Sequence, residues 1–273
     1  MKLLFSEAKP DYPHYVFPFA VWAFPDAGEA PSDLFGHGFL PSSPNLDRFY
    51  MCRHVRVALQ EYKASSENRR ILRKGNGLTA QLVPREEFEL TPSKRHFIKQ
   101  YAETKFGRDV MSDARLDRLF SSRIVTHILS FTDKGSDVGY VTLYIEPSRI
   151  AYYYYAFYDL AHLNKSLGLF MMTSAVERFA EAGLSHLYLG TCYSRNALYK
   201  TQFAGAQFFN GAKWSSNLEE LKFLIARQEQ AHTEHLWENA EFRQKFYPEP
   251  QVSLQDIALF HVEQLPCKLT NRG

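Results

Sequence analysis

The 273-residue sequence has few cysteines and no long apolar run. Its three cysteines, Cys52, Cys192 and Cys267, lie far apart and form no CxxC pair, which excludes a secretory disulfide framework and fits a reducing compartment. The longest apolar run, residues 15–24, contains Pro18 and is too short to cross a bilayer. The N-terminus soon reaches acidic residues and prolines, unlike a signal peptide. We therefore expect a soluble, cytoplasmic protein with no membrane partner.

An excess of charge of either sign is also absent. The 32 Lys and Arg against 30 Asp and Glu give a net charge of +2, so affinity for nucleic acid can be argued only from local clusters. One cluster spans residues 53–74, where seven Lys or Arg stand against two Glu. Arg forks offer paired hydrogen bonds to phosphate groups, which suits this excess. Taken alone, the segment is better explained as a solvated charged surface.

Hydrophobic periodicity predicts secondary structure along most of the chain. Residues 1–50 indicate turns and short strands, and residues 53–59 and 78–90 indicate two strands. The later elements are two helices, from Pro92 and after a Ser112 cap, then strands 124–131, 138–145 and 150–158, helix 166–183, strand 186–189, helix 195–203, strand 206–214 and one or two helices over 215–247.

From residue 93 onward, the order of the predicted elements is that of the GNAT acyltransferase fold. We therefore predict an α/β (α+β) protein with a GNAT-like, mixed but mostly antiparallel sheet flanked by helices, plus a small N-terminal subdomain. The predicted divisions are residues 1–92 for that subdomain, 93–250 for the GNAT-like transferase domain and 251–273 for a tail. Because one fold serves many activities, the order alone does not give a function.

A glycine turn opens the helix over residues 166–183. Its sequence is Lys165-Ser-Leu-Gly168-Leu-Phe170. GNAT enzymes place an Arg/Gln-x-x-Gly-x-Gly/Ala turn there, and its backbone N–H groups hold the pyrophosphate of acyl-CoA. Phe170 replaces the second small residue, and we expect it to crowd a diphosphate. An ordinary helix start beside a glycine explains the turn equally well.

The residues around this turn carry a second pattern, which comprises Phe157-Tyr158-Asp159, Tyr188-Leu189-Gly190, Tyr199-Lys200, Phe203 and Trp214. The segment resembles the aminoacyl-tRNA–protein transferases of the N-end rule pathway, which carry a Tyr-Asp-Pro element, a Ser-Leu-Gly helix start, a Tyr-Leu-Gly strand end, a Tyr-Lys pair and a Trp. Upstream, Cys52-Arg-His-Val-Arg56 and Ser65-Ser-Glu-Asn-Arg69-Arg70 agree with the family in order.

The chain departs from the family in three places. Leu160 stands where the family has the proline of its Tyr-Asp-Pro element, and Gly38-Phe39 is followed by Leu-Pro-Ser in place of basic residues. Many members carry four N-terminal cysteines associated with an iron–sulfur cluster, but only Cys52 is present here, and one thiolate cannot hold a cluster. We therefore expect a short form of the family with no metal and no cofactor.

The resemblance implies a function and a set of site residues. The implied reaction moves arginine or leucine from charged tRNA to the N-terminal α-amine of a target protein, which marks it for degradation. The acyl group would lie between strands 150–158 and 186–189, beside backbone N–H groups. The implied catalytic residues are Tyr158, Asp159 and Gly190, with Asp159 holding the aminoacyl amine, and the implied aminoacyl-tRNA-binding residues are Arg69, Arg70, Arg73, Lys74, Gly168, Tyr188, Tyr199 and Lys200. Partners are charged tRNA and a protein or peptide N-terminus, and the protein is expected to be a monomer.

Two other functions remain open from the sequence. One is an acyl-CoA-dependent GNAT N-acyltransferase, and the other is a non-catalytic family member that binds tRNA or a degron. Minor candidates are a zinc pair at His232 and His235, which lacks a third ligand, and Cys192 as a nucleophile, which lacks an activating base. His127 is expected to pack in a strand. In the run of tyrosines 152–155, alternate rings should face opposite sides of the sheet.

Overall fold

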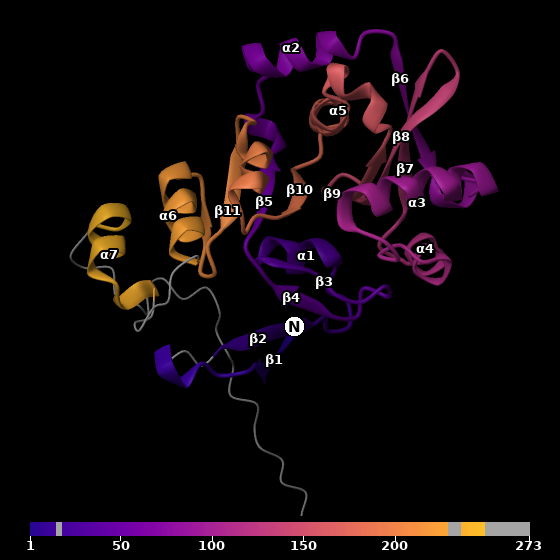
Figure 1. Ribbon diagram of the computed structural model, residues 1–273. Helices are drawn as coiled ribbons and strands as arrows, with labels where there is room; N and C mark the ends of the chain where they lie inside the picture. The colour runs from indigo at the N-terminus through magenta and orange to yellow at the C-terminus, as the bar shows by residue number, and fades with distance from the viewer. Residues whose placement is uncertain (15–17, 229–235, 249–273) are drawn as a thin grey trace, which may run out of the picture.

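The computed structural model describes residues 1–14, 18–228 and 236–248. An eight-stranded sheet stands above a smaller four-stranded N-terminal sheet (Figure 1). The strand order in the large sheet is β12-β11-β5-β10-β9-β8-β7-β6. Its strands are β5 His54–Ala58, β6 Leu78–Pro84, β7 His127–Asp133, β8 Ser136–Glu146, β9 Ile150–Tyr158, β10 His186–Thr191, β11 Ala206–Phe209 and β12 Trp214–Ser215.

Strands β7, β8 and β9 form the antiparallel run that their short polar turns predict. Asp133 pairs with Ser136, so Lys134 and Gly135 form a two-residue hairpin turn, and both have positive φ (50° and 83°). Such a turn matches the twist of its strands, and glycine in its second central position suits the left-handed backbone. The chemistry of this turn therefore sets the register of the run.

The parallel pair at the centre of the sheet comes from a helical crossover. Helix α5 (Leu167–Glu181) connects β9 to β10, which pair in parallel, and Gly183 ends the turn after the helix with φ +73°. On its other side β10 pairs antiparallel with β5, which comes from far upstream in the chain. The sheet is therefore mixed and mostly antiparallel, as predicted, with the parallel pairing of a GNAT-like fold.

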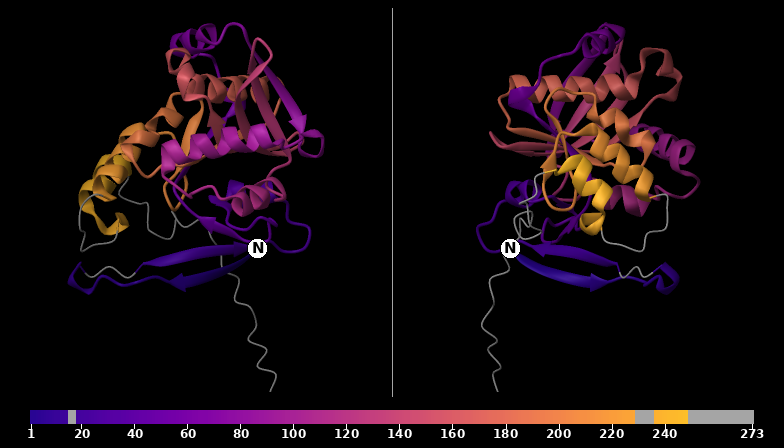
Figure 2. Two further views of the ribbon diagram at one scale, coloured as in Figure 1. Left: turned by 45° about the vertical axis from the view of Figure 1, so that its right-hand side comes forward. Right: turned by 90° about the vertical axis from the view of Figure 1, so that its left-hand side faces the viewer.

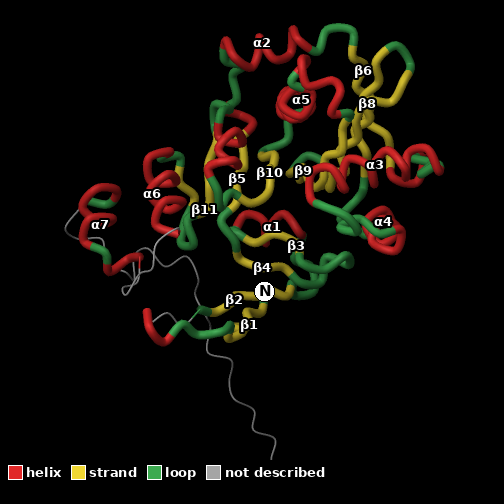
Figure 3. Tube along the Cα trace, in the orientation of Figure 1, coloured by secondary structure: helices red, strands yellow, loops and turns green. Residues whose placement is uncertain are grey.

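Helices cover both faces of this sheet (Figures 1 and 2). The α5 face packs into the largest core cluster together with α2 (Ser66–Lys74) and α6 (Leu218–Gln228). The opposite face packs against α3 (Pro92–Phe106) and α4 (Asp113–Phe120). Ser112 caps α4, as predicted, because its hydroxyl accepts from the Arg115 N–H at 3.2 Å. Helix α7 (Ala240–Phe246) lies outside α6 in Figure 3.

The N-terminal sheet has the order β1-β2-β4-β3 and carries the short helix α1 (Pro31–Gly36). Its strands are β1 Lys2–Glu7, β2 Phe19–Phe24, β3 Phe39–Pro41 and β4 Phe49–Met51. A separate aromatic core, which includes Phe35, Phe39 and Phe49, joins this sheet to the large one. The division at residue 92 stays a prediction, and the large sheet takes β5 and β6 from the sequence before it.

Four details differ from the sequence expectations. The strand expected over 78–90 ends at Pro84, where a 3-10 turn begins. Residues 195–201 form a 3-10 helix, and β11 and β12 form a hairpin in place of one strand. Helix α2 was not predicted; Ser65 and Asn68 cap it reciprocally at 3.0 and 3.1 Å. Within the described ranges, no helix is both long and apolar enough to span a membrane.

Candidate active site

A cleft of about 460 Å³ opens where β9 and β10 separate. The two strands pair only from Ile150↔His186 to Tyr152↔Tyr188, after which β10 shifts register on β5 and leaves β9. The strands therefore separate at the position where the resemblance implies that the acyl group lies. The residues that line the cleft are Tyr101, Phe106, Tyr153, Tyr154, Tyr155, Ala156, Tyr158, Ser166, Leu167, Gly168, Leu169, Met172, Leu189, Tyr199 and Lys200.

A bulge in β9 shapes the wall of the cleft. Thr142 pairs with Tyr155 and Leu143 pairs with Tyr153, so Tyr154 is an extra residue in the strand. The bulge breaks the expected alternation of the tyrosine run. Tyr154 and Tyr155 share the α3–α4 face, where their ring centroids lie 4.5 Å apart, whereas Tyr153 packs in the core on the α5 face.

Tyr153 lines the cleft and carries a buried hydroxyl. The residue is only 5% exposed, and its hydroxyl has no hydrogen-bond partner among the described residues. A buried hydroxyl without a partner costs about 1–3 kcal/mol, a cost that a polar group of a ligand would remove. Burial raises the pKa of Tyr153 well above its usual value, so the hydroxyl stays protonated and can donate.

Gly168 allows the Tyr158 ring to lie against the start of α5. A Cβ at Gly168 would lie 2.7 Å from the Cζ atom of that ring. The other side of Tyr158 meets Tyr101, with ring centroids 4.8 Å apart. The glycine is therefore needed for close packing of a cleft-lining tyrosine, and Gly168 itself also lines the cleft.

Lys200 brings a cation to the β10 side of the cleft. Its Nζ atom donates to the Thr191 carbonyl at 2.8 Å. Gly190 has φ +81°, and a Cβ there would lie 3.6 Å from the same Nζ atom. Burial lowers the pKa of Lys200. Tyr199 beside it is 48% exposed, so an aromatic face is open to a ligand.

The basic helix α2 lies beside α5 (Figure 1), and the first residues of α5 line the cleft. Lys74 Nζ is 3.5 Å from the hydroxyl of Ser166, which lines the cleft. Arg69, Arg70 and Arg73 are exposed on the same helix, and Arg70 pairs with Glu67. The structure therefore brings the upstream basic cluster to the glycine turn.

Phe170 does not act as the sequence led us to expect. It is buried, its ring packs against Phe131, and a Cβ at Gly75 would lie 2.1 Å from it. The side chain therefore joins α5 to the end of α2 and does not crowd the helix start. The prediction that Phe170 would crowd the diphosphate of an acyl-CoA was therefore wrong.

Besides the basic residues of α2, the predicted site residues Asp159, Tyr188 and Gly190 are not among those that line the cleft. Tyr188 is 1% exposed on the opposite face of β10, where its ring lies 4.8 Å from that of Phe35. Adjacent strand residues face opposite sides, so Leu189 takes the cleft position. Asp159 accepts from the Ala161 N–H at 2.8 Å and contacts His162 Nδ1 at 3.0 Å, and it faces a neighbouring hollow.

The cysteines and histidines give no metal or nucleophile site in the part of the chain that is described. No group of three or more His, Cys, Asp or Glu there could hold a metal ion. Burial raises the pKa of Cys192 and raises that of Cys52 to about 12, so neither is a thiolate at neutral pH. His127 is half-buried in β7. The proposed zinc pair at 232 and 235 lies outside the described residues.

Comparison with known proteins gives relatives of one kind. No family model matches the sequence. The aspartate/glutamate leucyltransferase of Chromobacterium violaceum is 25% identical over 187 residues, which cover 66% of this chain and 75% of that one. The enzyme of the same name from Hyphomonas neptunium is 27% identical over 214 residues, covering 70% and 81%.

Solved structures were compared as well. FemX aligns with a TM-score of 0.47 and 10% identity, over 77% of this chain and 74% of that chain. The C-terminal domain of a putative lysylphosphatidylglycerol synthetase from Agrobacterium fabrum aligns with a TM-score of 0.41 and 15% identity, over 65% and 64%.

The sequence relatives align with about two thirds of this chain, and they carry the name of a transferase. The sheet has the parallel pair and the helices on both faces that the predicted GNAT-like fold requires. The protein is therefore an aminoacyltransferase, and its sequence is similar to those of the aspartate/glutamate leucyltransferases, which supports the resemblance to the aminoacyl-tRNA–protein transferase family.

Proposed function

We propose that this protein transfers leucine from leucyl-tRNA to the N-terminal α-amine of acceptor proteins that begin with Asp or Glu. The cleft between β9 and β10 carries the proposal, because it combines an apolar wall, an unpaired buried hydroxyl and a basic helix at its mouth. The names of the relatives support the choice of leucine and of acidic acceptors. Transfer would mark the acceptor for degradation in the cytoplasm, where charged tRNA is made.

The lining of the cleft favours leucine over arginine. Its side chains are mostly aromatic or aliphatic, including Phe106, Leu169, Met172 and Leu189, and none is Asp or Glu. An arginyl side chain would enter without a carboxylate partner and near the Lys200 ammonium, at a cost in desolvation and repulsion. A leucyl side chain would instead bury apolar surface at about 25 cal/mol per Å².

The reaction is an aminolysis of an activated ester. The acceptor nitrogen attacks the aminoacyl carbonyl carbon and forms a C–N bond, and the ester C–O bond breaks. The 3′-terminal ribose oxygen of the tRNA leaves, and the proton lost by the amine ends on that oxygen. Alignment of amine and ester supplies much of the rate.

The carbonyl oxygen that becomes negatively charged needs donors in the gap. Beyond Tyr152, the edge of β9 that faced β10 is unpaired, so its N–H groups are available. Tyr153 adds its hydroxyl, which has no partner among the described residues, and Lys200 adds a positive charge. We place the ester between these groups, with Tyr158 and Gly168 shaping the wall and Gly190 turning the backbone beside Lys200.

We place the tRNA on the α2 side of the cleft. The helix presents one basic face, formed by Arg69, Arg70, Arg73 and Lys74. Binding of tRNA phosphates to this face would release the counterions that surround the tRNA. The exposed ring of Tyr199 offers a stacking surface for an unpaired base near the 3′ end. Asp159 and Tyr188 lie away from the cleft, so we give them only an indirect part in holding its walls.

An activity matrix tests the proposal. Purified protein is mixed with leucyl-tRNA or arginyl-tRNA and with peptides that begin with Asp, Glu, Arg or Lys, and labelled amino acid on the peptide is counted. We expect leucine on the Asp and Glu peptides. Binding of charged tRNA without transfer would make the protein a non-catalytic member, and transfer from acetyl-CoA alone would make it an acyl-CoA enzyme.

The tRNA surface is tested through the salt dependence of binding. Arg73→Gln removes one exposed cation from α2, and we expect the slope of log K against log salt to fall by about 1. Arg243→Gln on α7 is the matched control, because this exposed arginine lies on a helix far from α2 (Figure 1). Equal slopes for the two variants would move the tRNA to another surface.

A further inference from the structure

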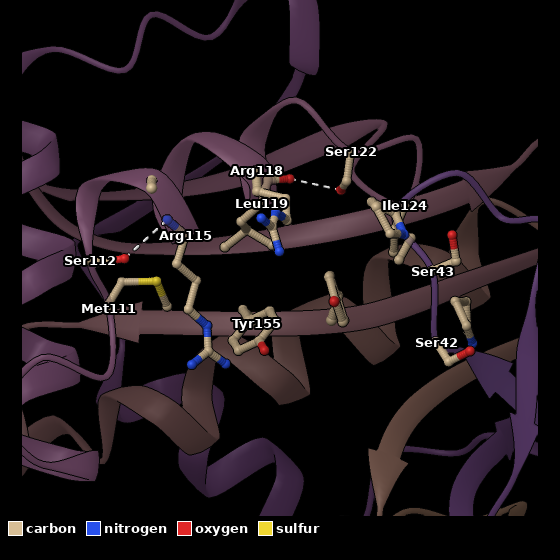
Figure 4. A pocket seen from close by; sticks show the side chains of 14 residues that line it. Ser42, Ser43, Met111, Ser112, Arg115, Arg118, Leu119, Ser122, Ile124 and Tyr155 are labelled. Atoms are coloured by element: carbon tan, nitrogen blue, oxygen red, sulfur yellow. Dashed lines mark hydrogen bonds between the residues drawn. The ribbon is translucent and has the colours of Figure 1, made fainter.

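A second hollow lies against the same bulge in β9. It has a volume of about 600 Å³ and is formed where the loop after β3 meets α4 (Figure 4). Its floor includes Tyr154 and Tyr155, and α4 supplies Arg115 and Arg118. The other lining residues are Pro41, Ser42, Ser43, Pro44, Met111, Ser112, Ala114, Leu119, Ser122 and Ile124.

The hollow is positively charged. Arg115 and Arg118 are three residues apart and so lie on one face of α4, and no Asp or Glu lines the hollow. The acids of α4 are engaged on its other side, because Asp113 pairs with Lys99 at 2.8 Å and Asp117 with Arg95 at 2.5 Å. Two guanidinium groups are therefore left without a carboxylate facing them.

Most of the donors on these arginines are available. Arg115 Nη1 donates one hydrogen bond to the Val110 carbonyl at 2.9 Å. The Arg118 guanidinium has no acceptor among the described residues. A guanidinium has five donors, and its planar fork matches the two oxygens of a carboxylate. The serine hydroxyls along the loop, at Ser42 and Ser43, add neutral donors. This lining suits a small organic acid group.

The hollow and the cleft share a wall. Tyr154 and Tyr155 line both, because the bulge turns two consecutive side chains to one face of β9. A ligand with its acidic group in the hollow would therefore lie against the same two tyrosines that line the cleft. The hollow lies on the α3–α4 face of the sheet, opposite the basic helix α2 and its α5 face.

We propose that this hollow binds the side-chain carboxylate of the N-terminal residue of the acceptor. The inference rests on the proposed function and adds its specificity site: Arg115 and Arg118 select Asp or Glu, and their positions direct the adjacent α-amine past Tyr154 and Tyr155 to the ester. Acceptor and tRNA then enter from opposite faces of the sheet and meet at the separation of β9 and β10. Charge complementarity and the shared wall carry this assignment.

The experiment compares peptides that differ only at their first residue, Asp or Asn. Wild-type protein, Arg115→Gln, Arg118→Gln, the double variant and the control Arg243→Gln are assayed with leucyl-tRNA. We expect each single change to lower kcat/KM for the Asp peptide about tenfold, mainly through KM, because charge-assisted hydrogen bonds to exposed groups are partly screened. The Asn peptide, the KM for leucyl-tRNA and the control should not change.

Other results would contradict either the arginine site in the hollow or the proposed transfer of leucine. An unchanged KM for the Asp peptide in the double variant would sink the inference, and a raised KM for leucyl-tRNA alone would assign the arginines to tRNA phosphates. Anisotropy of labelled peptides without tRNA keeps the two proposals separate. If wild-type protein transfers nothing, the proposed function fails, while weaker binding of the Asp peptide than of the Asn peptide would still reject the hollow. Both arginines are exposed, so their glutamine variants should fold.

Discussion

Gly168→Ala should separate stability from activity. The new Cβ would lie 2.7 Å from the Tyr158 ring, so the ring must move by about 0.7 Å to reach ordinary contact at 3.4 Å. Tyr101 backs the ring and resists this movement. Overpacking of this size lowers the free energy of unfolding by about 1 kcal/mol. The higher helix propensity of alanine raises it by up to about 1 kcal/mol. The two effects nearly cancel, so we expect Tm to change by less than about 4 °C.

Activity should respond differently, because the displaced ring forms a wall of the cleft. A misplacement of about 1 Å can cost up to about a hundredfold in rate, so we expect kcat for leucyl transfer to fall between tenfold and a hundredfold. The control is Gly183→Ala after the other end of α5, where φ is +73° and no atom lies near the added Cβ. That variant should lose about 1 kcal/mol of stability and keep its kcat. A Gly168→Ala protein with wild-type kcat would refute the placement of the acyl group beside Tyr158.

Three further predictions concern charge and burial. Lys200→Met should lower kcat/KM at neutral pH by about tenfold or more, because it removes the positive charge beside the reacting carbonyl. Tm should not fall, because burial disfavours the charged form of Lys200. Unchanged kinetics would exclude Lys200 from the site. Glu220→Ala should cost about 3 kcal/mol in urea unfolding, since Asn210, Ser215 and Tyr247 all lose their acceptor, whereas Glu220→Gln should cost less. Burial lowers the pKa of His54 to about 3, so its neutral form stabilises the fold above about pH 6.5 and this contribution is lost as pH falls toward 3. Between pH 7 and pH 5 the wild type should lose about 2 kcal/mol more than His54→Phe, and equal losses would contradict the assignment.

Local chemistry made much of the fold predictable. The turns at Lys134-Gly135 and around Ser148 separate strands that pair as their alternation predicts, and the Ser112 hydroxyl starts α4 as a cap. The glycine turn and the strands on either side of it were enough to locate the cleft, because a parallel pair joined by one helix leaves few alternatives.

What escaped the sequence depends on register and on distant contacts. The bulge at Tyr154 places consecutive tyrosines on one face, and no local pattern announces a bulge. The resemblance implied that Tyr188 binds aminoacyl-tRNA, whereas its side chain is buried on the other face of β10, and a run of apolar residues does not reveal which side each one takes. The second hollow needs the loop at residues 41–44 to meet α4, a contact between segments about seventy residues apart in the sequence.

The central position of β5 has a consequence for synthesis on the ribosome. The strand spans His54–Ala58, yet its neighbours on both sides, β10 and β11, come from residues 186–209. A nascent chain therefore carries an unpaired, mostly apolar β5 until roughly three quarters of the protein has been made. Such an edge can pair with other chains, and pairings of long sequence separation form late. Folding intermediates of this protein should thus be most vulnerable to aggregation through β5, and chaperones that bind extended apolar segments should recognise it before β10 emerges.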